Sequence, residues 1–311
     1  MSGRFTSLIL LGVSLFVWLV GALFDTPVNS TVFGFDTGNV MSRCITFVCF
    51  ALSSLMLSQW YVFDRRIRWL MPLSFSLASV SLFVHGCVEY SISLLLQQYL
   101  ICRLFECDPV DDNRYTIFSI FFLLGVAIMV FPQFVMLLPL SLIYLFMLSL
   151  AGVREILALL LGLLLPFWFF WGIGYIFPWV TEQMSPVSTL VGYVMSVGEG
   201  DFSLFEAVVG GVGLLVIIPF IAIFSGSSVP AKPVLRKRLR CLVLTILFLM
   251  SLSVLYDRDF TLYYIWSLPI LSVMLAYIYT VNVSRFSRYY FIFINIIWLL
   301  MVPFSLWLKH L

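Results

Sequence analysis

Long runs of apolar residues, separated by short polar stretches, extend along the whole chain. The runs are continuous rather than alternating, which predicts helices and argues against the strands of a barrel. Eleven such segments can be identified, at about residues 7–24, 41–61, 69–86, 91–105, 115–130, 133–151, 156–177, 205–225, 241–256, 262–282 and 289–308. The expected fold is an all-α bundle of about eleven spans. We expect one integral membrane domain over residues 1–311, with no soluble domain.

Two places in this pattern need comment. Segment 91–105 is short and contains Gln97, Gln98 and Arg103, so the sequence leaves open whether it crosses the membrane completely. Segments 115–130 and 133–151 meet at Phe131-Pro132. Proline lacks an N–H and disfavours helix in the residue before it, so a tight hairpin is expected there.

The composition supports a membrane protein. Of the 311 residues, 62% are hydrophobic and only 10% are charged, and the mean hydropathy is +1.10. A water-soluble fold cannot bury that much apolar surface, whereas a bilayer accepts it, provided that helices satisfy the backbone hydrogen bonds.

The positions of the basic residues predict a topology. If the N-terminus is cytoplasmic and the eleven segments alternate, fourteen of the 17 Lys and Arg residues fall inside, in agreement with the positive-inside rule. Only Arg43, Arg258 and Lys309 fall outside. The C-terminus is then periplasmic. The cluster LRKRLR (235–240) is the strongest cytoplasmic anchor, and it could also touch anionic lipid headgroups.

The stretch FGFDTGNVMSRC (33–44) contains the best candidate for a functional site. Arg43 is expected about one turn inside the outer boundary, and an ionisable residue within a membrane span indicates function by default. On this hypothesis Arg43 binds a phosphate and Asp36 acts as a base or as a metal ligand. The alternative is that Arg43 reaches out to the interface and that Asp36 only makes its loop soluble.

Other acids on the outer side are candidates for the same site. Glu89, Glu199, Asp201 and Asp257 are the residues that we expect to help bind a substrate, together with Arg43. Residues 187–206 could form an amphipathic cover over it. His85 and Glu89 are spaced as a helical metal-binding pair, but two histidines in the whole chain make a complete site improbable, so no metal is expected. The chain has no P-loop, GxSxG or HExxH motif, and no cofactor is expected.

The stretch from Asn113 to Trp171 resembles an uncharacterised family of multi-pass inner-membrane proteins of the Bacteroidota. The resemblance rests on Gly125, Phe131-Pro132, Arg154-Glu155 and the G-x-x-x-P of Gly162 to Pro166. It implies a bacterial inner-membrane location and no known activity. Some members of that family carry a carotene-oxygenase label, but this chain lacks the four histidines that such enzymes use to hold iron. A looser similarity in architecture is to glycosyltransferases that use polyprenyl-phosphate sugars.

Three kinds of function remain open. The first is a component of envelope biogenesis, as a scaffold or accessory subunit. The second is a glycosyltransferase-like enzyme or a flippase for a lipid-linked substrate, with its site at the periplasmic face. The third is a small-solute transporter, although neither midplane charges nor inverted repeats are evident. Membrane lipid, a lipid-linked glycan or other membrane proteins are the expected partners, and nucleic acid is not. Whether the protein is an enzyme is left open.

Overall fold

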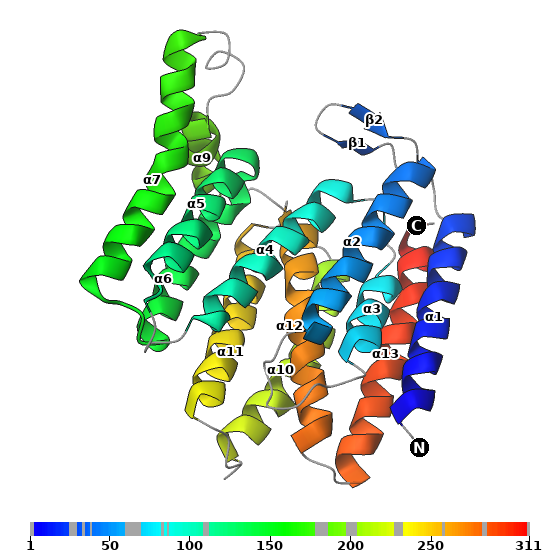
Figure 1. Cartoon of the computed structure of the whole chain (residues 1–311). Coiled ribbons are helices and arrows are strands. Elements are labelled where there is room, and N and C mark those ends of the chain that lie inside the picture. The colour runs from blue at the N-terminus through cyan, green and yellow to red at the C-terminus, as the bar shows by residue number, and fades with distance from the viewer. Residues whose placement is uncertain are drawn as a thin grey trace. The chain divides into compact units, whose positions relative to one another are not determined.

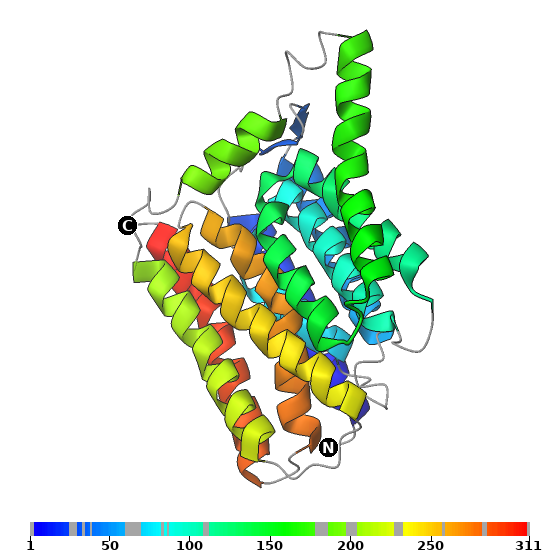
Figure 2. The same cartoon turned by 90° about the vertical axis from the view of Figure 1, so that its left-hand side faces the viewer.

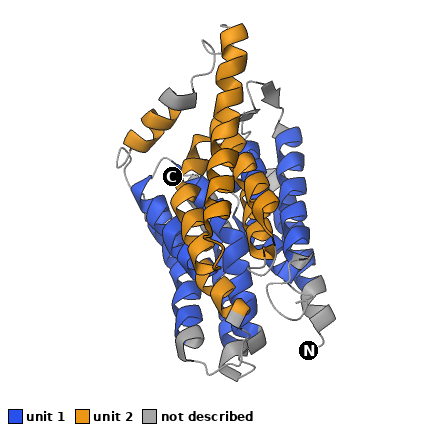
Figure 3. Cartoon of the chain, turned by 60° about the vertical axis from the view of Figure 1, so that its left-hand side comes forward, with its two compact units in different colours: residues 1–95, 200–231, 242–311 blue, residues 96–199, 232–241 orange. Residues whose placement is uncertain are grey.

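The computed structural model of the chain describes residues 3–24, 30–32, 35–37, 39–59, 70–81, 84–85, 87–107, 112–177, 186–196, 204–226, 233–256, 259–281 and 285–309. These residues divide into two compact units (Figure 3). Unit 1 comprises residues 1–95, 200–231 and 242–311, and unit 2 comprises residues 96–199 and 232–241. The prediction of a single integral domain over residues 1–311 stays a prediction.

Every predicted segment is helical at its core (Figure 1). The helices are α1 (Gly3–Phe24), α2 (Asn39–Gln59), α3 (Leu70–Val80), α4 (Val88–Glu106), α5 (Arg114–Val130), α6 (Leu137–Met147), α7 (Val153–Ile176), α9 (Pro186–Met195), α10 (Leu204–Gly226), α11 (Pro233–Leu255), α12 (Phe260–Val281) and α13 (Arg285–Lys309). A 3₁₀ helix, η2 (Pro132–Met136), precedes α6. A short antiparallel hairpin, β1 (Ser30–Val32) with β2 (Phe35–Thr37), departs from the all-α expectation.

The number of helices that could cross a membrane is smaller than expected. Within the described residues, four stretches are long and apolar enough by length and composition: Val40–Leu57, Val153–Ile176, Val234–Leu255 and Phe260–Tyr279. The count of eleven spans is therefore not supported. Helix α3 shows why, because its eleven residues rise only about 16 Å, roughly half of the hydrocarbon thickness.

Helices α3 and α12 form the core of unit 1. Ten of the eleven residues of α3 are buried, and 94% of the residues in Phe260–Tyr279 of α12 are buried. Around them pack α1, α2, α10 and α13. Figure 2 shows α10 and α13 lying beside α12. Because a helix buried on all sides offers no polar face to solvent, its polar side chains need partners inside the protein.

Indole and phenol groups supply those partners. Ser79 Oγ donates to Phe75 O on its own helix (2.6 Å) and accepts from Trp18 Nε1 of α1 (2.9 Å). Ser93 of α4 repeats the arrangement, since its Oγ donates to Tyr90 O (2.8 Å) and accepts from Trp266 Nε1 of α12 (3.0 Å). Each serine hydroxyl thereby bonds to its own helix and to a neighbouring helix at the same time.

Two further bonds join α3 and the residue after it to the surrounding helices. Ser81 Oγ lies 2.7 Å from the hydroxyl of Tyr264 in α12, and Trp298 Nε1 of α13 donates to Leu77 O (3.3 Å). Tyr263 and Tyr264, near the start of α12, are both buried.

In unit 2, glycines allow α5 and α7 to pack with their backbones in contact. A Cβ atom on Gly162 of α7 would lie 2.5 Å from Phe118 O, and one on Gly125 of α5 would lie 2.8 Å from Leu163 O. Both glycines belong to the sequence pattern on which the family resemblance rests, Gly125 and the G-x-x-x-P of Gly162 to Pro166. The opposite face of α7 is open, since only 17% of its residues are buried.

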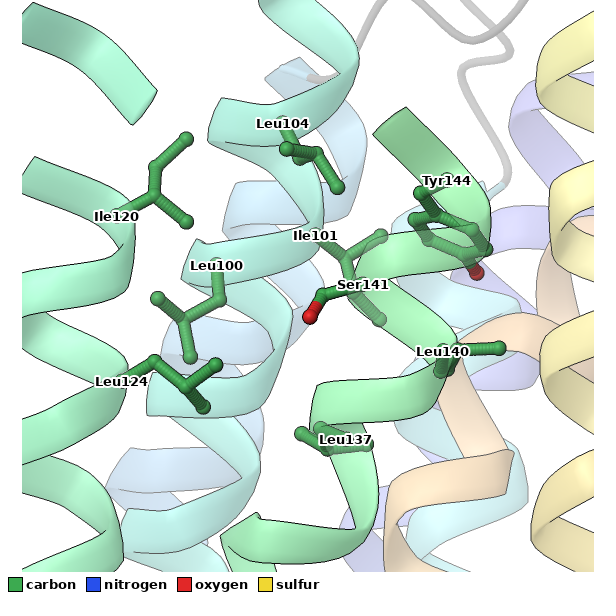
Figure 4. Close-up of a pocket in the computed structure, with 9 residues that line it drawn as sticks. All are labelled: Leu100, Ile101, Leu104, Ile120, Leu124, Leu137, Leu140, Ser141 and Tyr144. Carbon is green, nitrogen blue, oxygen red and sulfur yellow. The ribbon is translucent and has the colours of Figure 1, made fainter. Parts of the chain in front are cut away.

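The helix break expected at Phe131-Pro132 is confirmed. Phe131 has extended backbone angles (φ −127°, ψ 95°), α5 ends before it and η2 begins at Pro132. Helix α9 packs beside η2. Helices α4, α5 and α6 surround a cavity of about 30 Å³ (Figure 4). The cavity is apolar, and its two hydroxyls, those of Ser141 and Tyr144, donate to Leu138 O and Cys241 O, so it offers nothing to a polar ligand.

Replacing Gly162 by alanine is expected to destabilise the protein by about 1–3 kcal/mol, because the new methyl group would overlap backbone atoms of α5. The matched control is Gly172→Ala on the same helix, where a Cβ meets no described atom within 4 Å. Thermal unfolding of both variants in one detergent measures the difference. Equal midpoints for the two variants would refute the close packing of α5 and α7.

The ion pair before α5 predicts a pH dependence. The side chain of Arg114 donates to the Asp112 carboxylate and lowers the pKa of Asp112 to about 2. Because this pKa is below the unfolded value of about 3.9, the pair stabilises the fold above that pH, and its effect is lost as the pH falls through 2. The difference in unfolding midpoint between the wild type and Asp112→Asn should be constant from pH 7 to 5 and vanish near pH 2. A difference that persists unchanged at pH 2 would contradict this.

Candidate functional site

A buried cluster surrounds Trp18 in unit 1. The imidazole ring of His85, in the connection between α3 and α4, stacks on the indole of Trp18 with centroids 3.7 Å apart and ring planes within 2°. The ring of Phe47, on α2, meets the indole edge to face at 5.4 Å and 86°. His85 is only 2% exposed. Three elements that are distant in sequence therefore meet at one tryptophan, whose N–H bond to Ser79 fixes its position.

Arg43 lies on α2 one helical turn before Phe47, so its backbone is about 6 Å along the helix axis from the residue that contacts Trp18. Its side chain is 7% exposed, so the guanidinium is enclosed by protein and does not extend outward to the surface. A buried arginine is costly unless a negative group compensates it. Arg43 interacts with other groups of the protein, so its charge is not left without a partner.

The acidic residues that the sequence suggested for this site lie on several different elements. Glu89 lies in the first turn of α4, where a carboxylate is favoured by the positive end of the helix dipole. Since α3 ends at Val80, His85 and Glu89 are not on one helix, and the helical metal-binding pair is not formed. Asp36 lies in β2, where it pairs with Thr31, and α2 begins three residues later at Asn39. Glu199, Asp201 and Asp257 lie outside the described residues.

The structure thus places Arg43 one helical turn from Phe47, which packs against Trp18, and sequence reasoning did not place Trp18 or His85 in the site. Their signal was present in part, since a lone histidine between apolar segments is unusual. The stacking of His85 on Trp18 joins residues that are far apart in the chain, so no local sequence pattern predicts it. Within the described residues, no group of three or more His, Cys, Asp or Glu side chains could hold a metal ion.

An apolar groove of about 340 Å³ lies beside this cluster in unit 1. Three helices form its walls: α1 with Ile9, Leu10 and Val13, α3 with Ser76, Leu77 and Val80, and α13 with residues between Phe291 and Leu300. The polar side chains at the groove are bonded to their own helices, Asn295 to Phe291 O and Ser76 to Leu73 O. The groove is therefore lined for a hydrocarbon chain.

The groove and the cluster share a helix at their junction. Val80 lines the groove, while its neighbour Ser79 accepts the hydrogen bond from Trp18. Along α1, Val13 at the groove and Trp18 in the cluster are five residues apart, about 7.5 Å in rise. The groove and the Trp18 cluster thus adjoin the same two helices, α1 and α3, at neighbouring positions along the chain.

No protein-family model, no curated protein and no solved structure matches this chain.

The bond between Trp18 and Ser79 can be measured by a double-mutant cycle of Trp18→Phe and Ser79→Ala. We expect a coupling energy of about 0.6 kcal/mol, with an upper bound of about 1.7 kcal/mol, as for hydrogen bonds between helices in membranes. Trp171→Phe on α7, where the tryptophan is 63% exposed, serves as the control cycle with Ser79→Ala and should give no coupling. Zero coupling in both cycles would show that the bond does not hold α1 to α3.

Proposed function

We propose that this protein is a polytopic component of the bacterial inner membrane that binds an anionic, lipid-linked substrate of envelope biogenesis. Arg43 carries the proposal, because it places a positive charge at a position that is only 7% exposed on an apolar helix, and a phosphate could exchange with the partner that Arg43 has within the protein. His85 and Glu89 would face the head of the substrate as proton-exchanging groups. Asp36 keeps its proposed role as a base at the same end of α2.

The groove between α1, α3 and α13 would hold the hydrocarbon chain of that substrate. Its apolar lining and its position next to the Trp18 cluster support this assignment. An amphiphile with one phosphate head and one long apolar chain, such as a polyprenyl phosphate, combines both requirements. A glycosyltransferase-like enzyme and a flippase both need such a site.

The proposed topology has eleven spans, with a cytoplasmic N-terminus and a periplasmic C-terminus. The charge distribution of the sequence supports it. Helices α1 and α13 run side by side in the same direction, as an odd number of spans requires (Figure 1). Short helices such as α3 would then cross only part of the bilayer, surrounded by the longer ones. The Arg43 site would face the periplasm.

A scaffold or accessory subunit is the second candidate. The open face of α7 favours it, because Trp168, Phe169 and Trp171 lie exposed on a helix that is mostly unburied. A neighbouring membrane protein could cover this face. This function requires no ligand at Arg43.

Binding of a polyprenyl phosphate and of the uncharged polyprenol to the purified protein tests the proposal. The wild type should prefer the phosphate, and Arg43→Gln should weaken phosphate binding about 10- to 100-fold, as expected for a charged hydrogen bond of about 1.5–3 kcal/mol. Polyprenol binding should not change. Arg103→Gln, an exposed arginine at the end of α4, is the control for loss of one charge. Equal binding of both ligands to the wild type would reject Arg43 as a phosphate site.

The groove is tested separately by Val13→Phe, which places a ring in it. Binding of both ligands should fall at least tenfold, because the hydrocarbon chain loses its space. Leu19→Phe on the same helix is the control, since Leu19 is 59% exposed and does not line the groove. If Val13→Phe binds both ligands as tightly as Leu19→Phe, the chain does not lie in this groove.

A further inference from the structure

A second charged feature lies in unit 2, at the beginning of α11. Its first eight residues, Pro233 to Arg240, contain four basic side chains (Arg236, Lys237, Arg238 and Arg240) and no acid. Cations are disfavoured near the start of a helix, where the helix dipole is positive. This end of α11 therefore has a strong excess of positive charge within less than three turns.

At the other described helix ends in unit 2 that contain charged residues, each basic residue has an acidic residue close by in the sequence. Arg103 pairs with Glu106 at the end of α4 (2.8 Å), Arg114 pairs with Asp112 before α5, and Arg154 is followed by Glu155 at the start of α7. Among the described helix ends of unit 2, the start of α11 has the largest excess of basic over acidic residues, although Arg236 and Arg238 also interact with other groups of the protein. The excess thus belongs to one defined place and is not a general property of the unit.

Helix α6 holds this segment of α11 in place. The hydroxyl of Tyr144 donates to Cys241 O (3.0 Å), and Lys237 Nζ donates to Ser149 Oγ (2.8 Å) in the turn after α6. Tyr144 is fully buried. The basic segment is therefore held to α6 and the turn after it at Lys237 and at Cys241.

Ser149 adds a second sign of a built site. It has a positive φ of 63°, where glycine is the usual residue. Ser149 N–H donates to Phe146 O (3.1 Å) and Leu150 N–H donates to Leu145 O (2.8 Å), the bonds of a Schellman motif. A serine at this position strains the backbone, but its hydroxyl accepts the hydrogen bond from Lys237, which glycine could not do.

We propose that the start of α11, together with the turn after α6, binds the headgroup phosphate of an anionic phospholipid. The stretch Val234–Leu255 of α11 is apolar and long enough to cross a membrane, so the basic residues at its start lie at headgroup depth. Four cations with no acid among them complement an anionic headgroup and gain little from a zwitterionic one. This site is separate from Arg43 and independent of the proposed substrate.

The test uses the full-length protein, purified and incubated with phosphatidylglycerol, cardiolipin or phosphatidylcholine, with bound lipid counted by native mass spectrometry. The wild type should retain the two anionic lipids at least tenfold more than phosphatidylcholine, and high salt should reduce this preference. The triple variant Arg236→Gln/Lys237→Gln/Arg240→Gln should lose it at least tenfold. The control triple variant Arg103→Gln/Arg114→Gln/Arg154→Gln has the same net charge and should keep it.

Ser149→Gly tests the arrangement without endangering the fold, because glycine suits the positive φ. It should reduce the anionic preference about threefold by releasing Lys237, while the unfolding midpoint in the absence of lipid stays the same or rises. Equal retention of all three lipids by the wild type would overturn the proposal. An equal loss in both triple variants would also overturn it, because the preference would then depend on net charge alone.

Discussion

The hydrogen bonding of α3 is the constraint on which the arrangement of unit 1 depends. A short helix enclosed on all sides cannot leave hydroxyl or carbonyl groups for water to satisfy. Ser79 donates back to its own helix and accepts from Trp18 of α1, and Trp298 of α13 donates to Leu77 O. Just after the helix, Ser81 shares a hydrogen bond with the hydroxyl of Tyr264 in α12. Apolar contact gives such helices little directional preference in an apolar surrounding, whereas these bonds fix which side of α3 faces which helix.

Unit 2 solves the same problem by a different route. Helices α5 and α7 approach until backbone atoms touch, and glycines at positions 125 and 162 make this approach possible. Close backbone contact increases the dispersion attraction, because many atom pairs come into contact. Inside a membrane this attraction drives helix association, since the hydrophobic effect does not act between helices there. The two units therefore differ in what determines their geometry. In unit 1 it is hydrogen bonds between hydroxyl and indole groups, and in unit 2 it is glycines that let two helices approach closely.

The local features of this fold could be predicted from the sequence, and the long-range contacts could not. The helices follow from the length of the apolar runs, and the break at Phe131-Pro132 follows from the chemistry of proline. The end of α3 at Val80 was missed because the residues Leu82, Phe83 and Val84 that follow it continue the apolar run. Arg43 was found because a charge in an apolar segment is conspicuous, whereas Trp18 looked like any other apolar residue. The stack between Trp18 and His85 depends on tertiary packing alone.

The juxtaposition of the Trp18 cluster and the apolar groove limits the chemistry that this region can serve. A small polar solute would gain nothing from the groove, and a simple hydrocarbon would gain nothing from a buried guanidinium, whose desolvation has already been met in the folded protein. A ligand that benefits from both must have a charged head and an apolar chain joined in one molecule. Because α1 and α2 both pack against α3, the spacing between Arg43 and the groove, the two features of the proposed site, would be set before any ligand arrives. Such preorganisation reduces the entropy lost on binding, and it selects among amphiphiles by the distance between head and chain.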